Sequence, residues 1–475
     1  MIRLPTAQPA PLTLPAFDKR AFALATAVLL TACAVGPDYQ RPPAPVPAQY
    51  KEEGWKVGEP QDADRGPWWS IYNDPVLDGL ERQVDISNQN LRASEAAFRQ
   101  ARAIVAQARA GYYPTVGLSA SAQRSGSGTG GRIVGTSTGT TGVARTGGGS
   151  GNATLYDLTA SATWTLDVWG RIRRLVEADI ASAQASAADL AAARLSAQAQ
   201  LATAYFGLRA ADEQKRILDS TVVAYTQSLQ IARNQHNAGV AGLADVISAQ
   251  TQLETTQAQA IAVGVQRAQF EHAIAVLTGK PPAELGIEPA QMATQVPVIP
   301  AGMPSTLLER RPDIAAAERL MASANAQIGV ATAAYYPDLT LSASYGYSSF
   351  MFDNLLSAAN RFWAVGPQLA ETLFDGGLRG AQVEQTRAAY DQNVALYRQT
   401  VLTGFQQVED QLAALRILAQ QAEVQALAVR DANEAVRLTL NQYKAGTVPY
   451  TSVITAQAIA LGNEETAVTI LQGRL

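Results

Sequence analysis

The sequence predicts a mainly α-helical chain with four β-strands, built as a tandem duplication. Two proline-free runs rich in Ala, Leu and Gln, at 171–237 and 379–445, predict two very long helices. Each run follows a strand-like segment that ends in Leu-Asp or Phe-Asp, and each run stops at Ala-Gly. Helices of globular proteins typically have only about 8–20 residues, so these two favour an elongated architecture.

The two halves of the chain match at fixed offsets. Asp167 and Asp375 are 208 residues apart, whereas Tyr113 and Tyr336 are 223 residues apart. The offset changes within the segment 124–154, a loop rich in Gly, Ser and Thr that is longer in the first copy. Such self-similarity indicates an internal repeat.

The apolar residues of the first long run predict a coiled-coil seam. They recur in alternating steps of four and three residues at Leu201, Tyr205, Leu208, Leu218, Val222, Tyr225 and Leu229. The two runs end at Gly239 and Gly446, where glycine can adopt the left-handed conformation that stops a helix.

Four segments alternate between apolar and polar residues, which is the pattern of strands with one apolar face. They are 115–123 and 156–166 in the first copy, and 339–347 and 362–374 in the second. A tilted transmembrane strand needs about 9–11 residues. The smallest membrane barrels have about eight strands, and open edges are not tolerated in lipid. We therefore expect several copies of the chain to pool their strands.

The N-terminus has the pattern of a lipoprotein signal peptide. The apolar run 21–30 follows Lys19-Arg20, and Leu30-Thr31-Ala32-Cys33 resembles the bacterial lipobox. We expect residues 1–32 to be removed and Cys33, the single cysteine, to carry lipid. Ala34 after the cysteine points to sorting to the outer membrane.

The rest of the chain divides at proline-rich segments. We expect an N-terminal strap at 33–74, a first repeat at 75–280, an equatorial linker at 281–304 and a second repeat at 305–475. One helix is predicted over 75–111, and Pro312-Asp313 is placed to start another.

Composition and motifs argue against chemistry on a substrate. The net charge is −4 with no basic stripe, so nucleic acid is not expected as a partner. The two histidines, His236 and His272, lack metal-ligand spacing, and no nucleophile and base stand in a recognisable arrangement. We expect no enzyme activity, metal or cofactor.

Four motifs together carry a family resemblance. They are Cys33-Ala34-Val35-Gly36-Pro37-Asp38-Tyr39, Trp68-Trp69 with Asp74-Pro75, Leu166-Asp167-Val168-Trp169-Gly170-Arg171, and Leu308-Glu309-Arg310-Arg311-Pro312-Asp313-Ile314. They resemble the outer-membrane efflux protein family of TolC-type channel tunnels, in the lipoprotein branch attached to RND-type multidrug pumps.

The resemblance implies a homotrimer in the outer membrane of a Gram-negative bacterium. Four strands per protomer would contribute to a twelve-stranded barrel, continued by a long α-helical coiled-coil barrel in the periplasm. The trimer would be a passive duct, joined by a periplasmic adaptor (a membrane fusion protein) to an inner-membrane RND-type transporter. Type I protein secretion and a non-transporting periplasmic coiled-coil scaffold are the alternatives.

The resemblance also assigns roles to the ends of the long helices. The adaptor-facing turns would be at Gly239, Val240, Gly446 and Thr447, and the entrance candidates are Asp245, Tyr450, Ser452, Val453 and Thr455. Many family members carry aspartates where this chain has Ser452 and Thr455. We therefore expect closure of the entrance to depend on packing and neutral hydrogen bonds more than on a carboxylate ring.

Overall fold

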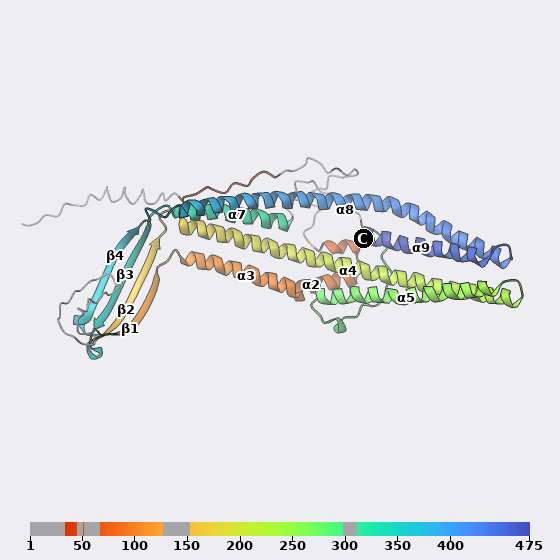
Figure 1. Cartoon of the computed structure of the whole chain (residues 1–475), viewed down its shortest axis with the longest axis horizontal. Helices are drawn as coiled ribbons and strands as arrows, with labels where there is room; N and C mark the ends of the chain where they lie inside the picture. Colours follow the sequence, from red (N-terminus) through yellow and green to blue (C-terminus); the bar gives the residue numbers. More distant parts are fainter. Residues whose placement is uncertain (1–33, 45–50, 52–66, 127–152, 298–310) are drawn as a thin grey trace, which may run out of the picture. The chain divides into compact units, whose positions relative to one another are not determined.

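The computed structural model describes residues 34–44, 51, 67–126, 153–297 and 311–475 (Figure 1). Cys33, the signal peptide and the 308–310 part of the Arg-Arg-Pro-Asp motif lie outside these residues. The chain forms two compact units. The sheet unit contains the described parts of Met1–Arg41, Ala101–Ala183 and Leu320–Asn393, and the helical unit contains those of Pro42–Gln100, Gln184–Arg319 and Val394–Leu475.

The four predicted strands are present as one antiparallel sheet in chain order (Figure 1). They are β1 (Thr115–Ser125), β2 (Ala153–Leu166), β3 (Asp338–Ser349) and β4 (Arg361–Ala370), with short turns η3 (Phe352–Asn354) and η4 (Ala358–Asn360) between the last two. The prediction that the last strand reaches residue 374 was wrong. β3 begins at Asp338, which is paired with Ala370, so β3 offers no strand partner for the residues after Ala370.

The register of the sheet separates apolar from polar residues. Residues paired across antiparallel strands share a face, and neighbours along a strand alternate. One face carries Val116, Leu118, Leu158, Ala160, Trp164, Leu341, Tyr345, Trp363, Val365 and Leu369. The other carries Thr115, Ser119, Ser121, Thr159, Ser161, Thr163, Thr340, Ser342 and Ser344. The predicted two-faced sheet is confirmed.

Two helices of equal length follow the two strand pairs. α4 (Arg171–Asn237) and α8 (Leu378–Lys444) each have 67 residues, close to the predicted bounds. The carboxylate of Asp167 accepts the N–H groups of Ile172 and Arg173, both at 2.9 Å. Asp375 accepts those of Gly377 and Arg379, at 2.9 and 3.2 Å. These aspartates satisfy N–H groups that an uncapped helix would leave unpaired.

The strap residues that follow Cys33 are held by the start of α4. Val35 donates its N–H to Trp169 O at 3.1 Å. The Arg174 guanidinium donates to Val35 O, Gly36 O and Asp38 Oδ1 at 3.3, 3.2 and 2.8 Å. Gly36 has φ +102°, and a Cβ there would lie 2.4 Å from the Cα of Gly329. Only glycine fits at this approach.

The helix predicted over 75–111 is two helices, α2 (Pro75–Ser87) and α3 (Gln89–Ala110). The break falls at Asn88, whose Oδ1 accepts the N–H groups of Asn90 and Leu91 at 2.9 and 3.1 Å. Its Nδ2 donates to Leu277 O at 2.8 Å. The prediction of one helix was wrong because an asparagine that caps a new helix is stabilised here by a distant carbonyl.

The helical unit is built on the predicted seam. It contains most of two helical hairpins, α4 with α5 (Leu243–Leu277) and α8 with α9 (Tyr450–Arg474) (Figure 1). It also contains α2 and η2 (Pro282–Glu284). Leu201, Tyr205 and Leu208 are buried in one core with Trp69 of η1 (Trp68–Tyr72). The Tyr205 hydroxyl donates to Asp74, which also caps α2 through Val76 and Leu77. α7 (Pro312–Ala333) starts at the predicted proline.

One carboxyl group of the helical unit is buried without a partner. Glu81 on α2 is 0% exposed, and both of its oxygens lack a hydrogen bond within the described part of the chain. Burial, with a smaller contribution from Asp85, raises the pKa of Glu81 to about 8. The group is therefore largely neutral at physiological pH.

No helix among the residues that the structure describes is long and apolar enough to cross a membrane.

Candidate functional site at the paired helical turns

The turn between α4 and α5 is a complete Schellman motif. Gly239 donates to His236 O and Val240 donates to Gln235 O, both at 2.9 Å. Gly239 has φ +74° and Gly242 is the N-cap residue of α5. The predicted helix stop at Gly239 is confirmed.

The turn between α8 and α9 repeats these bonds. Gly446 donates to Tyr443 O at 2.9 Å and Thr447 donates to Gln442 O at 3.0 Å. Gly446 has φ +77°, as the sequence predicted for the second stop. The two turns are therefore duplicates in backbone geometry as well as in sequence.

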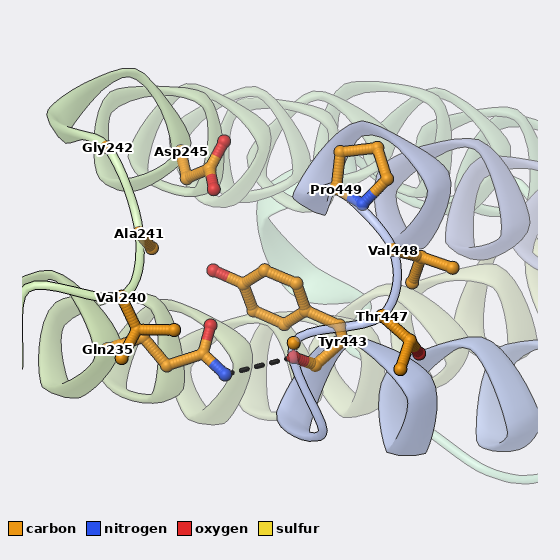
Figure 2. A pocket seen from close by; sticks show the side chains of 10 residues that line it. Gln235, Val240, Ala241, Gly242, Asp245, Tyr443, Thr447, Val448 and Pro449 are labelled. Carbon is orange, nitrogen blue, oxygen red and sulfur yellow. Dashed lines mark hydrogen bonds between the residues drawn. The ribbon is translucent and has the colours of Figure 1, made fainter.

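The two turns are joined by one side chain and enclose a hollow. Gln235 Nε2 donates to Tyr443 O at 3.0 Å, as the dashed line in Figure 2 marks. A hollow of about 310 Å³ lies between the turns. It is lined by Gln235, Val240, Ala241, Gly242, Asp245, Tyr443, Gly446, Thr447, Val448 and Pro449 (Figure 2).

Tyr443, which lines the hollow, also belongs to a buried aromatic core that the two hairpins share. Tyr225, Tyr443, Tyr450 and Val453 pack in one cluster, and the rings of Tyr443 and Tyr450 lie 5.1 Å apart. Burial raises the pKa of Tyr450 to about 12. Burial, followed by the charge of Asp245, also raises the pKa of Tyr443. These phenols are neutral at physiological pH, so the core adds packing and hydrogen-bonding groups but no charge.

The predicted tip residues lie at the outer surface of the turns. Val240 is 67% exposed. Thr447 is exposed and donates its hydroxyl to Gln442 O at 2.9 Å. The two glycines are exposed as well, and a Cβ on either would meet nothing within 4 Å.

The entrance candidates are divided between core and surface. Tyr450 and Val453 are buried between the hairpins of one chain. Ser452 is half-buried, and Thr455 is exposed with its hydroxyl donating to Thr451 O at 3.0 Å. Asp245 is half-buried in the first turn of α5 and lines the hollow (Figure 2). A carboxylate in the first turn is favoured by the helix dipole.

Sequence reasoning missed the polar residues that join the hairpins. Besides Gln235, the buried Gln457 of α9 donates to Ser228 Oγ of α4 at 3.1 Å. Glutamines are abundant throughout these helices, so nothing in the sequence distinguishes these two. The sequence gives a weak indication that Tyr443 lies at the turn, because the repeat aligns it with His236 near the end of the other long helix.

The arrangement offers backbone turns, hydroxyls, amides and one carboxylate, which suits contact and passage more than bond chemistry. Within the described ranges, no cluster of three or more His, Cys, Asp or Glu side chains could hold a metal ion. A two-faced sheet with open edges, continued by long helical hairpins, defines a protomer of a channel-forming membrane protein.

Comparison with known proteins gives the family. The sequence model described as outer membrane efflux protein matches residues 81–280 and 303–473. This chain therefore belongs to the outer membrane efflux protein family.

Similar proteins extend over nearly the whole chain. The probable efflux pump outer membrane protein TtgC of Pseudomonas putida is 31% identical over 89% of this chain and 85% of its own length. Outer membrane protein OprJ of Pseudomonas aeruginosa is 31% identical over 93% of this chain and 90% of its own. The solved structure of the outer-membrane channel OprN superposes with a TM-score of 0.83 at 29% identity, covering 93% and 97% of the two chains.

Proposed function

We propose that this protein is the outer-membrane channel of a tripartite efflux system. Three copies would form a passive duct that exports drugs or other small molecules and has no enzyme activity of its own. The observation that carries the proposal is the two-faced sheet, with apolar side chains on one face and hydroxyl side chains on the other. A wall between lipid and water needs both faces.

The open edges of this sheet support an oligomer, and the family resemblance implies three copies. Four strands leave β1 and β4 as open edges, and lipid does not tolerate unpaired backbone groups. Three copies supply twelve strands, the number that the family resemblance implies. Heat-modifiable migration of the detergent-extracted protein tests the trimer, and a monomer without heating contradicts it.

The two turns are the proposed contact with the periplasmic adaptor. Gly239, Val240, Gly446 and Thr447 are exposed and share one backbone geometry, so a trimer would present six similar turns. Val240→Cys and Thr447→Cys should crosslink to the adaptor in cells. Crosslinks confined to cysteines within 124–154 would reverse the proposed orientation.

A lipid on Cys33 is the proposed anchor. The next residues, Val35 to Asp38, are tied to Arg174 of the sheet unit, which would hold the lipidated residue near the strands. Radiolabelled palmitate should enter the wild type and not Cys33→Ala. Because the strands would insert independently, Cys33→Ala should still form the trimer.

Drug accumulation in the source bacterium tests the transport function. Deletion of the gene should raise the cellular accumulation of a fluorescent dye such as ethidium, and the wild-type gene should restore export. A deletion that leaves dye and drug export unchanged but removes a secreted protein from the medium would instead support type I secretion.

A further inference from the structure

The edge strands β1 and β4 could pair with each other between copies of the chain, and the sheet itself indicates the register of that pairing. β2 belongs to the first copy of the repeat and β3 to the second, and they pair in the middle of the sheet. β4 is the repeat counterpart of β2, and β1 is the counterpart of β3. The β2–β3 pair is therefore a template for pairing β4 with β1 of another copy.

The hairpin registers fix how the template is transferred. Leu118 of β1 corresponds to Leu341 of β3, 223 residues later. Leu118 lies opposite Ala160, and Leu341 lies opposite Pro367. Ala160 therefore corresponds to Pro367, which gives β2 and β4 an offset of 207 residues. Asp167 and Asp375, however, are 208 residues apart. The second connector, which joins β4 to α8, therefore has one additional residue before its aspartate, Phe374.

We propose that β4 of one copy pairs with β1 of the next copy with Gln368 opposite Ser121. This is the transferred position of the pair Ser161–Ser344. The transferred position of Leu166–Leu339 places Leu373 opposite Val116, so that β4 lengthens on assembly. The proposal rests on the homotrimer proposed above and adds the register of its interface.

The faces of the sheet agree with this register. Gln368 pairs with Thr340 and Ser121 pairs with Asp157, so both belong to the polar face. Leu373 continues the apolar series of β4, and Val116 lies on the apolar face. A shift by one residue would place each side chain opposite one of the other face.

The exposure of the second connector shows what assembly would cover. Leu373 is 90% exposed, whereas its counterpart Leu166 is half-buried beside β3. A strand that continues beyond Ala370, as the sequence pattern predicts, would thus form only when β4 pairs with β1 of another copy. Pairing with a second copy would supply the hydrogen-bonding partner that residues 371–373 lack along β3.

An aromatic contact within the chain has an unfilled counterpart. Trp169 stacks on Tyr336 at 4.8 Å and donates its indole N–H to Pro337 O at 2.9 Å. The counterpart of Tyr336 is Tyr113, which is 71% exposed. Phe374, the single aromatic residue of 371–377, is 87% exposed. The geometry points to Phe374 of one copy covering Tyr113 of the next.

Disulfide crosslinking in the full-length protein in native membranes tests the register. Gln368→Cys is combined with Ser121→Cys, and the matched controls combine it with Ser119→Cys or Gln123→Cys, two residues to either side on the same face. Mild oxidation should crosslink copies through Ser121→Cys severalfold more than through either control. The single-cysteine variants control for Cys33.

The outcomes separate this proposal from the homotrimer. Strongest crosslinking at 119 or 123, or an intact trimer without crosslinks at any of the three pairs, overturns the register and leaves the trimer standing. A protein that is monomeric without heating overturns both proposals.

A double-mutant cycle tests the aromatic contact without cysteines. Phe374→Ala and Tyr113→Ala should each lower the temperature at which the trimer dissociates, and the double variant should lower it less than the two effects added. Leu356→Ala, at an exposed residue outside the proposed contact, should leave it unchanged. Additive effects overturn the pairing of these two residues.

Discussion

The two connectors between strand and helix, residues 167–170 in the first copy and 371–377 in the second, belong to corresponding parts of the repeat but lie in different surroundings. In the first, Trp169 stacks on Tyr336, and Gly170 lies against Ala34 of the strap. In the second, Leu373 and Phe374 are exposed. The first connector is covered by residues next to β3 and by the strap, and the second connector has no corresponding contacts among the described residues. A duplication therefore reproduces the segment but not its surroundings, and in the assembly proposed here another chain covers the last copy.

The aspartates that cap α4 and α8 also differ between the two copies in the arginine with which they pair. Arg379 pairs with Asp375 at 2.6 Å, and this pairing with backbone N–H bonds lowers the pKa of Asp375 to about 2. In the first copy, Arg173 lies 3.4 Å from Asp167, while Arg171, which aligns with Arg379, lies 3.8 Å from Asp338. Both copies therefore keep the capping aspartate, but the arginine that pairs with it stands at a different position of the repeat in each copy.

The largest effect at a fixed pH should come from the glycines of the two connectors. Gly170 and Gly377 have φ of +81° and +93°, and alanine in a left-handed conformation costs about 1–2 kcal/mol. A Cβ on Gly170 would also lie 2.9 Å from Ala34 Cα, whereas one on Gly377 would meet nothing within 4 Å. We expect Gly170→Ala to cost about 3 kcal/mol or more, because overpacking adds to the strain.

Urea titration in detergent measures the free energy of unfolding of both variants. Gly377→Ala is the matched control and should show the conformational cost alone. Equal costs for the two substitutions would mean that the strap does not contact the first connector in solution.

The next effect concerns the arginine that binds the strap. Arg174 is buried, and the repeat aligns it with the exposed Gln382. Arg174→Gln makes the first copy resemble the second and leaves strap carbonyls without a donor. We expect a loss of about 2–3 kcal/mol and faster proteolysis within residues 34–44. Gln382→Ala should change neither quantity, and unchanged proteolysis in Arg174→Gln would contradict the role given to the arginine.

A pH effect should come from Glu81, the buried carboxyl group on α2 of the first copy. The pKa of Glu81 is about 8 in the folded chain against 4.5 ordinarily, so the folded chain binds more protons between these values. Stability should therefore fall as pH rises through this window, by about 1.4 kcal/mol per pH unit. Glu81→Gln should flatten this dependence in urea titrations from pH 5 to 8, whereas Glu95→Gln on the exposed face of α3 should not.

The smallest effect should be on ion block at the entrance. Asp245 in the first copy aligns with Ser452 in the second. Carboxylates in a narrow ring attract cations, and hydroxyls do so far less. In bilayer recordings we expect weak block by Mg²⁺ in the wild type and stronger block in Ser452→Asp and Thr455→Asp. Strong block in the wild type that Asp245→Asn removes would show that the first copy alone supplies a charged ring.

Most of the fold could be predicted from the sequence, because it rests on periodicity. α4, α8 and the four strands follow patterns that extend over many residues. The break at Asn88 depends on the carbonyl of Leu277, which is far along the chain, so no local pattern signals it. The end of β4 depends on a partner strand, and its sequence continues the strand pattern beyond that partner.

The candidate site was predictable in its backbone but not in its side-chain contacts. Both glycine stops were visible, because few residues other than glycine adopt the left-handed conformation. That Tyr450 and Val453 are buried between hairpins depends on how α9 packs on its neighbours. The burial of Glu81 does have a sequence signal, since it shares the helical face of Leu77, Leu80 and Val84.

The equal lengths of α4 and α8 limit how this protein can change by insertion or deletion. One added residue advances a helix by about 1.5 Å and turns it by about 100°. In one copy only, that change would separate Gln235 from Tyr443 and rotate one turn away from its duplicate. Tolerated length changes should therefore occur in both copies together, and steps of about seven residues would also restore the seam. Gene duplication has thus made the lengths of two distant stretches of coding sequence depend on each other.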